Sequence, residues 1–133
     1  MEDQALTERI IGCAMRVHST LGPGFLESVY RRALEHGLRK AGLNVEAEKP
    51  ITVIYDGVPV GDFVADLIVE NRVMLELKSV QALVLPHEVQ LVNYLTATGI
   101  EVGLLLNFDR ERLELKRKTG IYRPKPPPKN FIL

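Results

Sequence analysis

The first forty residues carry apolar side chains at the spacing of α-helices. Apolar residues recur every three or four positions from about residue 3 to residue 21, and Gly22-Pro23-Gly24 follows. This pattern predicts an amphipathic helix that ends at the glycine-proline turn. A second helix should follow and end at Gly42. The two apolar stripes are Leu6, Ile10, Cys13, Val17 and Leu21 in the first helix, and Leu26, Val29, Tyr30, Ala33, Leu34 and Leu38 in the second.

From Val45 onward the pattern changes to β-branched and alternating residues. Turn sequences at Asp56-Gly57 and at residues 70–72 separate three such runs. Short alternating runs between turn residues are typical of antiparallel strands joined by hairpins. The sequence therefore predicts three antiparallel strands, with cores at residues 51–55, 62–69 and 73–80.

The remaining pattern predicts one more helix and one more buried strand. Pro86 suits the first turn of a helix that runs to about Thr98, before Gly99. Residues 102–107 form a continuous apolar run that indicates a buried strand, and residues 113–118 are compatible with an edge strand. The predicted order is helix, helix, three strands, helix and strand, which is an α/β domain.

Length and composition fit one ordinary folded domain. The chain has 133 residues, 46% hydrophobic and 26% charged, and single cores usually organise chains of about this size. We expect the domain to span residues 1–122. Residues 123–133 are basic and rich in proline, and proline lacks the amide donor that a sheet or helix interior needs, so this segment is expected to be a tail.

The formal net charge of zero conceals an asymmetry between the two ends of the chain. Residues 1–108 carry a net charge of −5 and residues 109–133 carry +5. A basic end can contact phosphate, but basic tails are also common solubilising elements, and taken alone the second interpretation is favoured. Cys13, the single cysteine, cannot form an internal disulfide. With no apolar run of about 18 residues to span a membrane, a cytoplasmic protein is expected.

Three charged residues converge in the second predicted hairpin. A turn at residues 70–72 centres the pairing of the two strands on Asn71, so that Asp66 lies directly opposite Glu76. Opposed Cβ atoms are about 4.5–5.5 Å apart, and the two-residue period of a strand places Lys78 on the same face as Glu76.

These strands are expected to be buried on both faces, because apolar residues surround the charges. The opposite face carries Ala65, Leu67, Val69, Val73, Leu75 and Leu77, and the charges are flanked by Val64, Ile68 and Met74. Two facing carboxylates are destabilising in such a place unless a positive charge accompanies them. Convergent carboxylates suit a hard divalent cation such as Mg²⁺ or Mn²⁺.

A divalent cation next to a lysine is typical of a hydrolytic active site. The cation would polarise a phosphoryl oxygen and lower the pKa of its bound water, while Lys78 would position that water or stabilise the charge of the transition state. The alternative is a partly exposed ion pair of Lys78 with Glu76 and Asp66 at the end of the hairpin. Three charges on one predicted face with apolar neighbours favour the functional interpretation.

Two predicted helices offer further candidate residues. Glu27 opens the second helix, where a carboxylate is favoured by the helix dipole or serves as a third metal ligand. In the third helix Gln90 and Tyr94 lie on one polar ridge with His87, while Val92 and Leu95 are expected to face the core. The ridge is either an exposed helix face or a set of groups that bind phosphate, a base edge or the carboxylates.

These residues resemble a known group of proteins. Gly24-Phe-Leu-Glu27-Ser-Val-Tyr30 resembles the signature of the GxxExxY proteins, a bacterial and archaeal family within the PD-(D/E)XK nuclease superfamily. Asp66 with Glu76-Leu77-Lys78 resembles the split catalytic motif of that superfamily, with Ala65 in place of the usual proline. Gln90-Leu-Val-Asn-Tyr94 is similar to the QxxxY motif of its RecB-like nucleases. The match covers most of the chain.

The resemblance implies both a fold and an active site. The fold is a restriction-endonuclease-like core of helix, three antiparallel strands, helix and strand, here with an extra N-terminal helix. The implied catalytic residues are Asp66, Glu76, Lys78, Glu27, Gln90 and Tyr94, of which Asp66, Glu76 and Glu27 would hold Mg²⁺ or Mn²⁺.

Two functions from different classes follow from these observations. The first is a metal-dependent nuclease that hydrolyses phosphodiester bonds, with DNA favoured over RNA. The second is a catalytically inert module of the same fold that binds nucleic acid or a partner protein. The complete set of Asp66, Glu76 and Lys78 favours the nuclease, because a scaffold has no reason to bury uncompensated carboxylates. A domain this small has little room for elements that select a nucleic-acid target. A homodimer or a partner protein is therefore expected to contribute to that selection.

Overall fold

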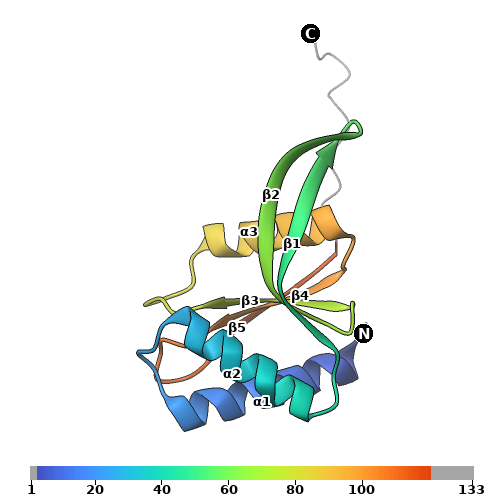
Figure 1. The fold of residues 1–133 in the computed structure, drawn as a ribbon. Coiled ribbons are helices and arrows are strands. Elements are labelled where there is room, and N and C mark those ends of the chain that lie inside the picture. The colour runs from blue at the N-terminus through green and yellow to red at the C-terminus, as the bar shows by residue number, and fades with distance from the viewer. Residues whose placement is uncertain (1–2, 121–133) are drawn as a thin grey trace.

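The computed structural model describes residues 3–120, and its elements follow the order predicted from the sequence. The expected α/β class and the expected core order, with an additional helix at the N-terminal end, are therefore confirmed (Figure 1). The elements are α1 (Gln4–Leu21), α2 (Glu27–Lys40), β1 (Val45–Tyr55), β2 (Val58–Val69), β3 (Val73–Lys78), α3 (Leu85–Thr98), β4 (Val102–Asn107) and β5 (Glu114–Thr119).

The five strands form one sheet in the order β1-β2-β3-β4-β5. β3 and β4 are parallel, and α3 is the crossover between them, whereas the other neighbouring strands are antiparallel. Figure 1 shows α1 and α2 on one face of this sheet and α3 on the other. The side chains of β3 therefore alternate between two buried clusters, with Leu75 on the side of α1 and α2 and Met74 on the side of α3.

The buried row of α2 differs in part from its predicted apolar stripe. Tyr30, Leu34 and Leu38 are fully buried, one on each turn. Leu26 and Val29, predicted to belong to the same stripe, are 76% and 37% exposed. Leu26 precedes the helix as its N-cap, and Val29 lies one position away from the row that repeats every four residues, so neither reaches the core.

The buried residues of α3 are also offset from the prediction. Leu91 and Leu95 are fully buried, whereas Val92 is only half-buried. The expectation that Val92 faces the core is therefore wrong, and its neighbour Leu91 takes that position. The Cβ of a residue replacing Gly103 of β4 would lie 2.9 Å from a methyl group of Leu91, so the missing side chain of Gly103 lets α3 approach the sheet.

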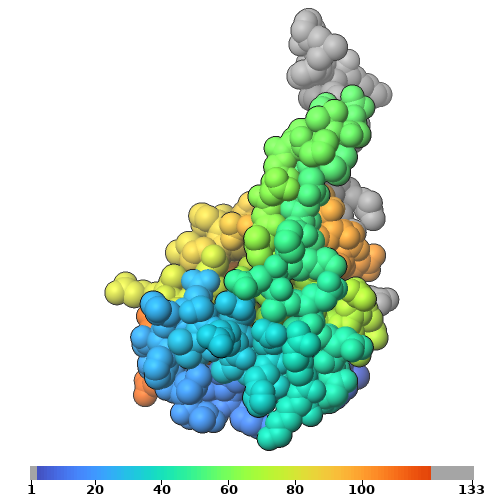
Figure 2. Space-filling model, in the orientation of Figure 1, coloured from blue at the N-terminus to red at the C-terminus, as the bar shows by residue number. Residues whose placement is uncertain are grey.

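The outer parts of β1 and β2 form a hairpin arm that stands away from the body of the molecule (Figures 1 and 2). β2 pairs with β3 only through its last three residues, Leu67, Ile68 and Val69, and the rest of β2 pairs with β1 alone. Val64 on this arm is 52% exposed, and Ala65 packs with the cluster on the side of α3. The predictions that Val64 is buried and that Ala65 shares the face of Leu67 are therefore wrong.

Two further expectations concern the molecule as a whole. Within residues 3–120, none of the helices combines the length and the apolar character that crossing a membrane requires. The expected domain end at residue 122 and the basic, proline-rich tail at residues 123–133 lie outside the described residues.

Candidate functional site

Asp66 and Glu76 lie where β2 parts from β3. The last paired residues are Leu67 and Leu75, and continuing this register places Asp66 opposite Glu76, as predicted. The Asp66 N–H donates to Glu76 Oε1 at 3.3 Å, and the Leu77 N–H donates to Asp66 Oδ2 at 2.8 Å. Each carboxylate therefore accepts a backbone hydrogen bond across the gap, and the two side chains are held next to one another.

Glu76 is buried, Asp66 beside it is half-buried, and the two carboxyl groups are short of positive charge. Glu76 is only 6% exposed. Burial, followed by the charge of Asp66 and a hydrogen bond between the two side chains, raises the pKa of Glu76 to about 9, while Lys78 opposes the rise. Two carboxylates this close cannot both ionise easily, so the pair keeps a proton at neutral pH. A cation at the pair would take the place of that proton.

Lys78 is the nearest cation on the same strand. It ends β3 two residues after Glu76 and is half-buried. Among residues 3–120 it has no ion-pair or side-chain hydrogen-bond partner. Its backbone is fixed, because the Phe108 N–H donates to the Lys78 carbonyl oxygen at 3.0 Å. The backbone of Lys78 is therefore fixed next to the pair, and the charge of its ammonium acts on Glu76 without a salt bridge.

Glu27 belongs to α2, which lies on the opposite face of the sheet from α3 (Figure 1), and its carboxyl is near the same site. It is the first residue of α2 and is open to solvent on one side. Loss of water around its carboxyl raises the pKa of Glu27, Asp66 adds to the rise, and Lys78 and His87 oppose it. The first turn of α2, the end of β3 and the first turn of α3 therefore meet around the carboxylate pair.

Tyr94 of α3 completes the site on the side of the arm. Its ring stacks on Phe63 of β2 with centroids 3.7 Å apart and planes 7° from parallel. Burial raises the pKa of Tyr94, and the charges of Glu76 and Asp66 raise it further, which places the phenol near the pair. Gln90, one turn earlier on α3, is exposed, and among residues 3–120 no hydrogen bond joins its side chain to the site.

The sequence interpretation missed a buried polar clamp behind Lys78. The Asn107 amide donates to the Val80 carbonyl at 2.8 Å and to Glu114 Oε1 at 3.0 Å, while its own oxygen accepts the Val80 N–H at 3.0 Å. Glu114 Oε1 also accepts the Leu83 N–H at 3.1 Å. The two side chains thus hold the loop from β3 to α3. In the sequence, the signal for these contacts was Asn107 itself, a polar residue at the end of the apolar run of β4.

The backbone of β1 departs from regular strand geometry beside the pair. Glu48 lies across from Asp66, between the pairs Ala47–Leu67 and Lys49–Ala65, and has a φ of 49°. This left-handed conformation is uncommon for a residue with a side chain and is costly within a strand. Its carboxylate lies 3.4 Å from the Arg31 guanidinium of α2. The sheet is therefore bent at the level of Asp66.

The donor set fits a hard divalent cation. Asp66 and Glu76 supply carboxylate oxygens, which Mg²⁺ and Mn²⁺ prefer, and the raised pKa of Glu76 shows that positive charge is lacking. Within residues 3–120, no three His, Cys, Asp or Glu side chains form a ready-made ligand group. Mg²⁺ usually keeps several water ligands, so the pair is a sufficient protein contribution, with Glu27 as the next carboxylate.

Comparisons with known proteins agree with this architecture. The family model of the PD-(D/E)XK nuclease superfamily matches residues 4–118. The fold is similar to that in the crystal structure of SSO0001, with a TM-score of 0.60 and 20% sequence identity. That match covers 91% of this chain and 61% of SSO0001, so the chain spans less than two thirds of that protein. No curated protein matches the chain.

Proposed function

The chain belongs to the PD-(D/E)XK nuclease superfamily, and we propose that it is an active, metal-dependent nuclease that hydrolyses phosphodiester bonds, in DNA rather than RNA. Within the superfamily we place it among the GxxExxY proteins, on the motif from Gly24 to Tyr30, and we interpret residues 90–94 as a QxxxY motif. The proposed domain spans residues 1–122.

The carboxylate pair is the proposed metal site. Asp66 and Glu76 would hold Mg²⁺ or Mn²⁺, with Glu27 as a further ligand or as a holder of water. When bound, the divalent cation supplies Lewis-acid stabilisation of phosphoryl charge and makes water more acidic. The backbone N–H groups of Asp66 and Leu77 orient the two carboxylates, which supports their assignment as metal ligands.

The remaining proposed residues act on water and phosphate. Lys78 has a free ammonium beside the pair, which suits it to orient the attacking water or to stabilise the negative charge that develops on phosphorus oxygens. Tyr94 donates from its phenol, whose raised pKa keeps it protonated. Gln90 is assigned to phosphate or base contact, since its exposed amide can both donate and accept. In the reaction the water oxygen bonds to phosphorus, and one ester P–O bond breaks.

One observation carries the proposal: the buried Glu76 lies next to the half-buried Asp66, beside a lysine that makes no ion pair among residues 3–120. An inert module that binds nucleic acid or a protein needs no such pair, because burying two acids without a cation destabilises the fold. The raised pKa of Glu76 agrees with that cost. A catalytically inert module of the same fold explains the backbone hydrogen bonds that the two carboxylates accept, but not the cost of burying Glu76 next to Asp66.

Cleavage assays on defined substrates test the proposal. The chain is incubated with labelled single- and double-stranded DNA and RNA in Mg²⁺, Mn²⁺ or EDTA. Cleavage should require the metal and should disappear in Asp66→Ala. The matched control is Asp62→Ala on the same strand, because Asp62 is exposed on the arm, bonded to Thr52, and outside the site.

Thermal unfolding distinguishes a chain that binds metal without cleaving nucleic acid from a chain that has no metal site. A cation that binds only the folded chain raises the melting temperature, so millimolar Mn²⁺ should stabilise the wild type and Asp62→Ala but not Asp66→Ala. Metal-dependent stabilisation without cleavage of any substrate would favour the inert module. If Mn²⁺ gives neither a higher melting temperature nor cleavage, the proposed metal site is refuted.

A further inference from the structure

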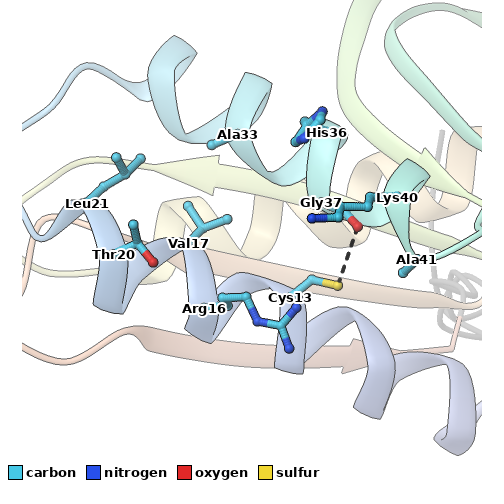
Figure 3. A pocket seen from close by; sticks show the side chains of 10 residues that line it. All are labelled: Cys13, Arg16, Val17, Thr20, Leu21, Ala33, His36, Gly37, Lys40 and Ala41. Atoms are coloured by element: carbon cyan, nitrogen blue, oxygen red, sulfur yellow. Dashed lines mark hydrogen bonds between the residues drawn. The ribbon is translucent and has the colours of Figure 1, made fainter.

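A groove between α1 and α2 shares no residue with the carboxylate site. It has a volume of about 430 Å³ and is open to solvent on one side. Figure 3 shows the residues that line it. Its apolar floor consists of Val17 and Leu21 from α1 and Ala33 from α2, all half-buried. Figure 3 shows the side chains of Cys13 and Val17 pointing from α1 toward α2.

The groove exists because the residues of α2 along it are too small to fill the space between the helices. Ala33, Gly37 and Ala41 follow one another at every fourth position and all line the groove. A Cβ added at Gly37 would meet no atom within 4 Å. Apolar surface left in water is unfavourable by roughly 25 cal/mol per Å². An apolar side chain from another molecule would therefore be stabilised here.

The rim of the groove is positively charged. Arg16, His36 and Lys40 line it, and no carboxylate of the described residues does. Within residues 3–120, Arg16 and Lys40 have no ion-pair partner. The nearby Glu35 is already paired with Arg39 at 3.1 Å. The uncompensated cations beside an apolar floor favour an occupant that is both apolar and acidic.

We propose that this groove binds an acidic amphipathic helix of a partner protein. From Cys13 to Leu21 the α1 side measures roughly 12 Å, from a rise of about 1.5 Å per residue, which is the length of two helical turns. The open side suits a helix, whose polar face remains in water. An alkyl chain needs closer enclosure, since small ligands usually have about 70–90% of their surface buried. The surface is independent of the proposed nuclease chemistry.

Peptide titration tests the chemistry of the occupant. Fluorescent helical peptides are built with leucine at i, i+3, i+4 and i+7 and glutamate at the flanking positions, and a matched set carries lysine in place of glutamate. Binding to the full chain is measured by fluorescence anisotropy. The acidic set should bind at least tenfold more tightly than the lysine set, and the difference should shrink as salt screens the charges.

Two glycine substitutions test the location. Gly37→Leu should fill the groove and reduce binding of the acidic set at least tenfold. Gly12→Leu is the matched control, because Gly12 is also helical and free of neighbours within 4 Å, but it is exposed and does not line the groove. Both changes replace a helical glycine by a better helix former, so both variants should remain folded, as thermal unfolding will show. Arg16→Glu combined with Lys40→Glu should reverse the preference toward the lysine set.

The single cysteine gives a direct readout of occupancy. Cys13 lines the groove, and the chain has no other cysteine, so the bound acidic peptide should slow its alkylation by iodoacetamide severalfold. Equal binding of both peptide sets, unchanged binding by Gly37→Leu, or no binding of any acidic peptide would each overturn the proposal. Oleate that binds the wild type but not Gly37→Leu, with no peptide bound, would identify an anionic lipid as the occupant instead.

Discussion

Replacing Glu76 by glutamine tests the buried carboxylate pair without any substrate. Glutamine has nearly the size of glutamate and keeps a carbonyl oxygen to accept the Asp66 N–H. It carries no charge at any pH. The substitution therefore removes the electrostatic strain of the pair while leaving its packing and its backbone hydrogen bond in place.

The size of the effect follows from the shifted pKa. The pKa of Glu76 is about 9 in the folded chain, against an ordinary value of 4.5. Between these values the folded chain holds more protons than the unfolded chain, so the free energy of unfolding falls by up to about 1.4 kcal/mol per pH unit as the pH rises. The stability associated with this proton is complete below the ordinary value and is lost as the pH rises toward the folded value. At neutral pH the loss amounts to about 3 kcal/mol.

Urea unfolding in EDTA measures this difference. The wild type and Glu76→Gln are compared at several pH values from about 5 to about 8, and the variant should gain stability relative to the wild type with each step. Glu101→Gln is the control, because Glu101 is exposed and has no buried charge to relieve. A stability difference between wild type and Glu76→Gln that stays constant over this range would refute the reasoning about the shared proton.

Four further predictions concern the surroundings of the pair and the basic end. Lys78→Met keeps an apolar stem but loses the ammonium, so single-turnover cleavage should fall at least about a hundredfold while calorimetric metal binding persists or tightens; loss of both would mean that Lys78 is structural. Phe63→Leu removes the ring stacked on Tyr94 and should lower kcat more than it changes KM, whereas Phe63→Tyr should retain the rate; equal rates in both would exclude a positioning role. Glu114→Ala removes an acceptor of two hydrogen bonds and should destabilise the chain by about 1–3 kcal/mol in urea unfolding; unchanged stability would show that these bonds do not hold the loop. Deleting residues 123–133 should weaken nucleic-acid binding and flatten its salt dependence, and an unchanged slope would leave the basic end without a phosphate role.

The register of the site hairpin could be predicted because it depends on local chemistry. Glu70 and Asn71 take left-handed φ values of 55° and 54°, which the mirror-image hairpin turns require and which asparagine tolerates well. Once that turn is placed, the two-residue period of the strands fixes which residues oppose one another. Asp66 and Glu76 could therefore be paired from the sequence.

The hairpin arm could not be predicted, because a strand shows the same alternation whether it has one paired neighbour or two. Residues 58–65 of β2 are rich in valine and other strand formers, as are the residues that do pair with β3. What differs is the bend beside Asp66, where Glu48 adopts a positive φ. Nothing in the periodicity marks that bend, so Val64 was expected to be buried and is exposed.

The partners of the candidate site residues were also beyond local reasoning. Phe63 and Tyr94 lie on different elements and meet only because α3 crosses over the sheet beside the arm. Asn107 and Glu114 reach the loop after Lys78 because β4 and β5 pair next to β3. Such contacts depend on how the elements are packed, and the sequence pattern describes each element separately.

The position of the pair at the parting of two strands follows from hydrogen-bond requirements. Where β2 leaves β3, the N–H groups of Asp66 and Leu77 lose their strand partners, and buried donors without acceptors are destabilising. The two carboxylates supply those acceptors. The same arrangement brings two acids together in a buried place, which raises the pKa of Glu76. The electrostatic cost of the pair and the cation binding that we propose for it therefore have a single structural origin, the bend that separates the arm from the sheet.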